Sequence, residues 1–223
     1  MKFAFLLMMS CFVCAQDDVK EVLNKFNKKY SSKELSDRIS AVKELSDYKH
    51  REILNVLAQL TTKDAAEVRS AAVEVISEYT EDEYKTDVIT ILVKAIEANS
   101  KMPVVIARSL EGLGNTGDKS LAKLINKYLD HEDNEVARSA VLASAKLGSV
   151  RSIVPLIDLL EKLEKLREVK RSEASRAGLP RSGASEMNKK IRARKKALLE
   201  PTLRALAKIT GVELATAKEY RQW

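Results

Sequence analysis

The stretch Val68-Arg-Ser-Ala-Ala-Val-Glu-Val-Ile76 places its apolar residues at positions i, i+3, i+4, i+7 and i+8, which is one stripe along an α-helix. The same pattern returns three more times in the chain. The aligned positions are spaced by 31, 34 and 34 residues, and a period of this length is typical of helical repeat proteins. The related stretches are Asp37 to Leu45, Val105 to Leu113 and Val136 to Ser144, with Ala41, Ala72, Ile106 and Ala140 at the aligned positions.

Between these stretches the sequence predicts a second set of helices with the same period, over residues 53–60, 88–96 and 121–129. A unit of two such helices cannot bury its apolar face alone, so neighbouring units must stack. Alanine at an aligned position allows two helix backbones to approach closely. The composition agrees, because 7 Gly, 4 Pro and 5% aromatic residues among 223 are too few for the turns and strands of a sandwich or barrel. We therefore predict an all-α fold.

Several motifs resemble HEAT repeats. They are Asp64-x3-Val68-Arg69-x2-Ala72, Asn134-Glu-Val136-Ala-Arg138-x-Ala140, the pair Leu147-Gly148 and the run Ile153 to Leu160. The resemblance covers about residues 17–160 and implies a right-handed α-solenoid of about five two-helix repeats. It also implies that Arg69 and Arg138 bond between neighbouring repeats rather than to a ligand. The third repeat has Val104-Val105-Ile106 in place of the Val-Arg pair, so the sequence does not decide whether a ladder of Asp–Arg bonds continues through this repeat.

Residues 1–15 have the order of a signal peptide. Met1-Lys2 is followed by an apolar run, and Val13-Cys14-Ala15 supplies small residues before a cleavage site at Gln16. The apolar run is about half of the ~20 residues needed to span a bilayer. We therefore predict export to the periplasm or the cell exterior. A buried N-terminal helix and lipoprotein processing at Cys11 are the alternatives.

Positive charge is concentrated between Lys165 and Lys196. This segment has twelve Lys and Arg against three acids, whereas the whole chain has a net charge of only +7. We predict repeats over residues 16–162, a flexible basic insertion over 163–192, and the last repeat helix with a cap over 193–223. A solvated loop without a ligand is the alternative to an anion-binding segment. The candidate anion-binding residues are Lys189, Lys190, Arg192, Arg194, Lys195 and Lys196.

The motif Thr216-x-x-Glu219 predicts a capping box that opens a short helix near the end of the sequence. The surrounding pattern, which includes Tyr220 and Trp223, is similar to the ends of secreted bacterial HEAT-repeat proteins. We favour a cap that covers the apolar end of the solenoid, as terminal repeats require. A partner-docking anchor formed by Tyr220 and Trp223 is the alternative.

No catalytic, metal or cofactor site is predicted. His131-Glu132 resembles one of the His-Glu pairs of HEAT-type iron hydroxylases, but those enzymes need several pairs, and His50 is followed by Arg51. The cluster Gly112-Leu-Gly-Asn-Thr-Gly117 lacks the strand and the lysine of a phosphate loop, and we interpret it as a turn between helices. We predict a protein that is not an enzyme and needs no cofactor.

The fold favours a non-catalytic exported scaffold that binds a protein or peptide on the concave face of the solenoid. The alternative is an envelope protein that binds an acidic polymer, anionic lipid or nucleic acid through residues 165–196. Added salt would weaken the second kind of binding steeply, and would change apolar recognition on the concave face little.

Overall fold

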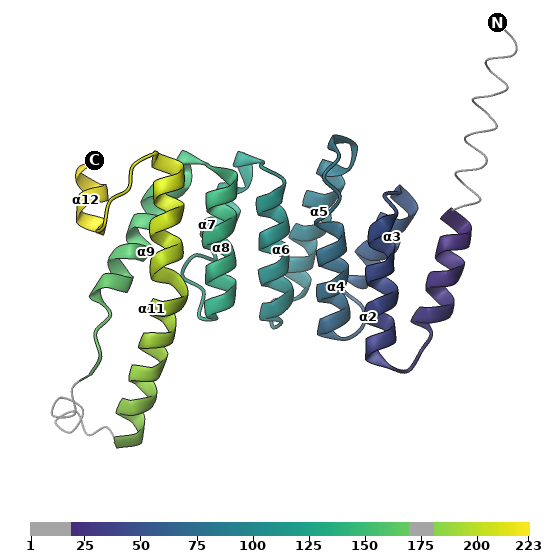
Figure 1. Ribbon diagram of the computed structural model, residues 1–223, viewed down its shortest axis with the longest axis horizontal. Coiled ribbons are helices and arrows are strands. Elements are labelled where there is room, and N and C mark those ends of the chain that lie inside the picture. The colour runs from purple at the N-terminus through teal and green to yellow at the C-terminus, as the bar shows by residue number, and fades with distance from the viewer. Residues whose placement is uncertain (1–18, 170–180) are drawn as a thin grey trace, which may run out of the picture. The chain divides into compact units, whose positions relative to one another are not determined.

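The computed structural model describes residues 19–169 and 181–223, and within these ranges every regular element is a helix (Figure 1). The predicted all-α fold is confirmed. The chain divides into two compact units, residues 1–112 and 113–223, and the boundary falls within helix α6 (Pro103–Asn115). The predicted signal peptide and both of its alternatives lie outside the described residues.

The first unit is built from paired helices. Helices α2 and α4, each the second of its pair, pack on one another, and α3 packs on α4. The aligned residues Ala41 and Ala72 are buried, as expected for positions where neighbouring backbones approach. In order, the unit contains a helix over residues 19–30, α2 (Leu35–Glu44), η1 (Leu45–Asp47), α3 (Arg51–Leu60), α4 (Ala66–Ile76), α5 (Asp82–Ala98) and most of α6.

The second unit continues the same pairing. Figure 1 shows α8 and α11 side by side, and α11 packs on both α8 and α9. The aligned residue Ala140 on α8 and Thr202 on α11 are fully buried, and the Thr202 hydroxyl donates to the carbonyl of Leu198 at 2.7 Å. After α6 the unit contains η2 (Lys119–Leu121), α7 (Ala122–Asn126), α8 (Asn134–Leu147), η3 (Val150–Ser152), α9 (Ile153–Lys165), α11 (Arg181–Thr210) and α12 (Ala217–Gln222).

The glycine cluster at residues 112–117 is not simply a turn, which corrects the sequence interpretation. Gly112 and Gly114 lie inside α6, and only Gly117, with φ of +65°, lies in the turn that follows. A Cβ atom on Gly112 would lie 2.2 Å from the Ser77 hydroxyl oxygen, and one on Gly114 would lie 2.7 Å from the Cα of Ala143. Both glycines are therefore required by close packing of α6, a need that sequence alone does not separate from turn formation.

Helix α11 begins at Arg181, whereas the last repeat helix was expected to begin at residue 193. Residues 181–192, expected as part of the flexible insertion, are helical; residues 170–180 lie outside the described ranges. The early start has a physical cause. Ala184 is buried, and the Asn188 side chain accepts from the Val169 amide at 2.8 Å and donates to the Val169 carbonyl at 3.1 Å, which ties the first turns to the chain leaving α9.

Two glycines and the predicted capping box define helix ends in the second unit. Gly148 has φ of +59° and caps α8, a left-handed conformation that glycine adopts without a steric penalty. Helix α11 ends before Gly211. Thr216 and Glu219 form the predicted capping box at the start of α12.

Candidate functional site

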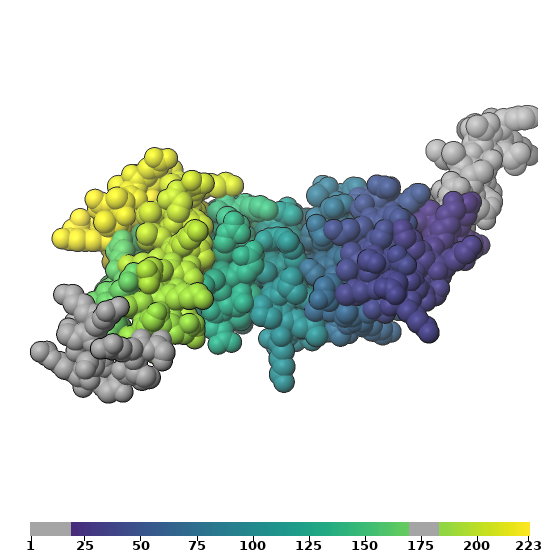
Figure 2. Space-filling view, turned by 60° about the horizontal axis from the view of Figure 1, so that its bottom comes forward, coloured from purple at the N-terminus to yellow at the C-terminus, as the bar shows by residue number. Residues whose placement is uncertain are grey.

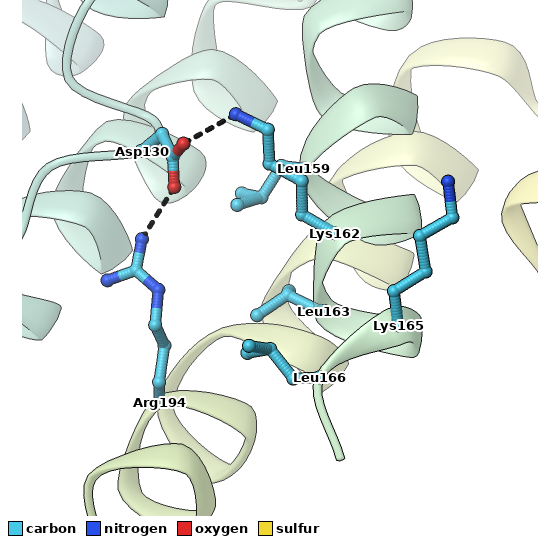
Figure 3. Close-up of a pocket in the computed structure, with 7 residues that line it drawn as sticks. All are labelled: Asp130, Leu159, Lys162, Leu163, Lys165, Leu166 and Arg194. Atoms are coloured by element: carbon cyan, nitrogen blue, oxygen red, sulfur yellow. Dashed lines mark hydrogen bonds and ion pairs between the residues drawn. The ribbon is translucent and has the colours of Figure 1, made fainter. Parts of the chain in front are cut away.

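A groove lies in the second unit where α9, α11 and the loop before α8 converge (Figure 3). Its floor is apolar, because α9 and its extension present leucines toward α11, and its rim is charged. The volume of the groove is about 360 Å³. The lining residues are Leu159, Leu163 and Leu166 on the floor and Asp130, Lys162, Lys165 and Arg194 on the rim.

Asp130 organises the rim. Its two carboxylate oxygens accept from the Lys162 ammonium at 2.5 Å and from the Arg194 guanidinium at 2.8 Å (Figure 3). Burial alone would raise the pKa of Asp130, but the hydrogen bonds and positive charges of Lys162 and Arg194 outweigh it and lower that pKa below its usual value. The carboxylate is therefore held in its ionised form.

Arg194 is committed to the fold. Besides the bond to Asp130, its guanidinium donates to the His131 carbonyl at 2.9 Å and to the Asn134 side-chain oxygen at 3.2 Å. Its side chain is only 19% exposed. Of the predicted anion-binding residues, Arg194 is thus the one whose donors are already used to hold α11 against the loop that precedes α8.

The other predicted cations differ from Arg194. Arg192 is exposed and forms a loose ion pair with Glu168 at 3.5 Å. Within residues 19–169 and 181–223, no ion pair involves Lys189, Lys190, Lys195 or Lys196. Of these four lysines, all except the half-buried Lys195 are exposed. Among the described residues, α11 therefore carries four lysines that form no ion pair, and Arg194 differs from them because its donors are used within the fold.

The two aromatic candidates, Tyr220 on α12 and Trp223 directly after it, differ in exposure. Tyr220 is 2% exposed, and its hydroxyl donates to the Val212 carbonyl at 3.0 Å and accepts from the Leu214 amide at 3.3 Å. A ring in that position serves the cap and has little surface to offer a partner. Trp223, in contrast, is 61% exposed.

In the first unit, Asp64 is the centre of a polar network. It has φ of +90° and accepts from the Tyr30 hydroxyl at 2.5 Å, from the Ala65 amide at 2.6 Å and from Arg38, with which it forms an ion pair at 3.3 Å. Burial and the hydrogen bond to Asp64 together raise the pKa of Tyr30 to about 12. The network positions the turn before α4.

The structural role predicted for Arg69 is confirmed. Its guanidinium donates to the Asp64 carbonyl at 2.9 Å and to the Asn99 side chain at 2.8 Å, so it bridges two successive helix pairs. Asn99 continues the link by donating to the Thr61 carbonyl at 2.9 Å. Arg138 behaves differently from the expectation, because it pairs with Glu135 of its own helix at 3.5 Å.

Both histidines act as local hydrogen-bond acceptors. The Nδ1 of His50 accepts from the Glu52 amide at 3.2 Å, and the Nδ1 of His131 accepts from the Asp133 amide at 3.1 Å, each at a helix start. The described part of the chain holds no group of three or more His, Cys, Asp or Glu side chains placed to bind a metal ion.

Sequence reasoning missed Asp130 and Lys162. The signal that was available is the acidic loop at residues 130–133, which lies between two predicted helices and carries the charge opposite to that of the later basic segment. Opposite charges far apart in the sequence indicate a contact only when the pairing of the helices is known.

Comparison with known protein families gives a match, which covers part of the chain. Residues 89–174 match the family of HEAT repeats. This match supports a HEAT-repeat protein, in agreement with the paired helices described above. HEAT repeats are commonly non-enzymatic scaffolds for protein interaction, and no catalytic family is indicated. No curated protein matches the chain.

Proposed function

We propose that the protein is an exported, non-catalytic HEAT-repeat scaffold that binds a protein or peptide on the concave face of a right-handed solenoid of about five repeats. The observation that carries the proposal is the side-by-side packing of second helices, α2 with α4 in the first unit and α8 with α11 in the second. Such packing leaves the outward side of each second helix uncovered along the stack. Among the described residues, no helix combines the length and the apolar character needed to cross a bilayer.

The uncovered sides of these second helices are charged. Glu74 on α4 lies 3.7 Å from Lys43 on α2 in an exposed ion pair, and Arg138 on α8 and Arg204 on α11 have side chains 43% and 78% exposed. Recognition on this surface would therefore be polar and sensitive to salt. This changes the expectation from sequence, which assumed apolar contacts on the concave face.

The test compares two double charge reversals in an affinity capture from envelope extract. Arg138→Glu with Arg204→Glu changes the second helices; Arg51→Glu with Lys94→Glu changes first helices by the same charge. The proposal requires that a reproducible partner is lost with the first variant and kept with the second. Equal loss with both, or loss with the first-helix variant alone, would contradict it.

Export is tested separately by the intact mass of the secreted protein. Cleavage after Ala15 gives a chain that starts at Gln16. A secreted chain that starts at Met1, or no secreted chain, would rule out the signal peptide without bearing on the scaffold.

The exposed cations of α11 support a second candidate, an anion-binding function for the basic segment. Figure 2 shows side chains of α11 at the molecular surface. Lys189, Arg192 and Lys196 are exposed at helical spacings of three and four residues, which concentrates positive charge on one side of the helix. Replacement of these three residues by Ser should abolish binding to a soluble polyanion such as heparin at low salt. Unchanged binding would contradict an anion-binding role for these three residues and would favour a solvated surface without a ligand.

A further inference from the structure

A row of lysines lies on the outer side of the first helix of a pair in the second unit. Lys119, Lys123 and Lys127 follow one another at intervals of four residues along η2, α7 and the residue after α7, and all three are exposed. None of them forms an ion pair with a residue of 19–169 or 181–223. Like charges at this spacing destabilise a helix slightly, so their arrangement has a structural cost and no structural partner.

Arg151 extends this row onto the next helix. Its backbone carbonyl accepts from the Asn126 side chain at 3.2 Å, which holds η3 against α7. A shallow hollow of about 410 Å³ is lined by Lys119, Val150 and Arg151. The Arg151 side chain is exposed and, in the part of the chain that the structure describes, forms no ion pair.

Two large aliphatic side chains lie beside these cations. Val150 is 73% exposed and Val154, one turn later, is 60% exposed. They are followed on the outer side of α9 by Asp158 and Glu161, so the apolar character ends where the acidic residues begin. The two exposed valines, one turn apart, lie beside cations that form no ion pair with the described residues, and together they make a small amphipathic surface.

Trp223 directly follows α12, which packs on α9. Helix α12 runs antiparallel to α9, because the Ala217 amide donates to Glu164, near the end of α9, while Arg221 pairs with Glu161 at 2.8 Å and with Asp158 at 2.7 Å. The same direction carries Trp223 toward the first turns of α9. Its side chain is 61% exposed.

The acids near this surface are already engaged. Asp158 and Glu161 are paired with Arg221, and Asp130 is held by Lys162 and Arg194. Among the described residues, α7 and the start of α9 therefore present cations without an ion-pair partner beside exposed aliphatic side chains, and the indole of Trp223 is directed toward the first turns of α9. We name this surface the α7–α9 face, defined by Lys119, Lys123, Lys127, Val150, Arg151, Val154 and Trp223.

We propose that the α7–α9 face docks on the surface of an anionic lipid bilayer. Free cations at a protein surface are attracted by anionic headgroups, exposed aliphatic side chains enter the headgroup region, and tryptophan favours the interface because one end of its ring is polar. A nucleic acid would use the cations but would gain nothing from the valines. The face lies on first helices, so it goes beyond the scaffold surface proposed above.

Vesicle binding of the purified chain tests the proposal. The probes are vesicles of phosphatidylglycerol mixed with phosphatidylcholine, and vesicles of phosphatidylcholine alone, in low salt. We expect binding to the anionic vesicles only. Each Lys or Arg near an anionic surface strengthens binding about fivefold, so replacing Lys119, Lys123, Lys127 and Arg151 by Ser should weaken it roughly several-hundredfold.

The matched control replaces Lys20, Lys28, Lys33 and Lys63 of the first unit by Ser, which removes the same charge from exposed positions elsewhere. This control should lose less than about threefold, because these lysines lie outside the α7–α9 face and do not contact the headgroups directly. All variants carry the same N-terminal residues, so any contribution of those residues cancels. Equal loss in both variants, or no binding to anionic vesicles, would overturn the proposal.

Trp223 supplies a readout at the face itself, since it is the single tryptophan of the chain. Its emission should shift to shorter wavelength on anionic vesicles and should be quenched by brominated acyl chains. Val150→Ser with Val154→Ser should weaken binding several-fold. Binding without any change in Trp223 emission would place the contact elsewhere, and binding insensitive to both valines would indicate recognition of phosphate alone; either result contradicts a lipid-docking face.

Discussion

Replacement of Arg194 by Ala should destabilise the protein, unlike replacement of the exposed cations beside it on α11. Arg194 makes three hydrogen bonds, two to the loop before α8 and one to Asn134 at the start of α8, from a side chain that is 19% exposed. The Asp130 side chain is 52% exposed, so solvent screens that ion pair to about 0–1 kcal/mol. The hydrogen bonds to the His131 carbonyl and to the Asn134 side chain add about 0.5–1 kcal/mol each, the low end of the usual range because the site is partly exposed. We expect the free energy of unfolding to fall by about 2 kcal/mol.

The assay is urea unfolding followed by circular dichroism, with thermal unfolding as a check. For a chain of this length, a loss of about 2 kcal/mol corresponds to a fall of roughly 4–8 °C in Tm. Arg194→Lys keeps the charge but cannot reach three acceptors with a fixed fork of donors, so it should recover less than half of the loss.

The controls are Arg192→Ala and Lys196→Ala, which remove the same charge two residues away on the exposed side of α11. Both should change the free energy of unfolding by less than about 0.5 kcal/mol. If Arg194→Ala were no worse than these two, the three hydrogen bonds would contribute nothing measurable. The division of the basic cluster into a structural arginine and free cations would then be wrong.

Three further substitutions test the packing, the electrostatics and the cap. Gly114→Ala would gain about 1 kcal/mol of helix propensity, but its Cβ would lie 2.7 Å from the Cα of Ala143. The resulting overpacking costs about 1–3 kcal/mol, so we expect a net loss of stability. A higher Tm would refute the close approach of the two helices. Burial acts to raise the pKa of Asp64, but the Tyr30 hydrogen bond, the Ala65 backbone amide and the neighbouring arginines outweigh it and lower that pKa. The ionised carboxylate therefore stabilises the fold above its unfolded pKa, and this stability is lost as the pH falls through its folded pKa. Asp64→Asn, which tolerates the positive φ, should flatten the fall of stability measured between about pH 5 and 2, and an unchanged pH profile would contradict this. Thr216→Ala should cost about 1 kcal/mol and speed hydrogen exchange across α12 only; unaltered exchange there would mean that the capping box does not hold the helix.

The helical repeats were predictable because their signal is local and repeated. Each helix carries its own apolar stripe, and the aligned positions Ala41, Ala72 and Ala140 are buried as expected. The cluster at Gly112 and Gly114 was misinterpreted because the sequence alone does not show whether a glycine is needed for close packing or for a turn. What separates them is a neighbour, Ser77 or Ala143, about 30 residues away.

The start of α11 was predicted at residue 193 instead of Arg181 for a related reason. Residues 181–192 have a composition typical of a loop, and what makes them helical is burial of Ala184 and the two hydrogen bonds of Asn188 to Val169. These are tertiary contacts across 19 residues, which override weak local propensity. The capping box at Thr216, in contrast, is entirely local and was predicted correctly.

Charge density along the chain and charge density on the surface are different quantities, and the basic residues of this protein show why. The densest run in the sequence includes Arg194, whose charge is matched by Asp130, 64 residues earlier. Lys119, Lys123 and Lys127 are diluted by neutral residues in the sequence, yet a helical period of 3.6 residues brings them to one side, where no acid of the described residues pairs with them. A search of the sequence for cations repeated at intervals of four, with no acid at the same spacing, would have found this row. A binding surface for anions therefore depends on which cations the fold leaves unpaired, and the longest basic run in the sequence need not supply it.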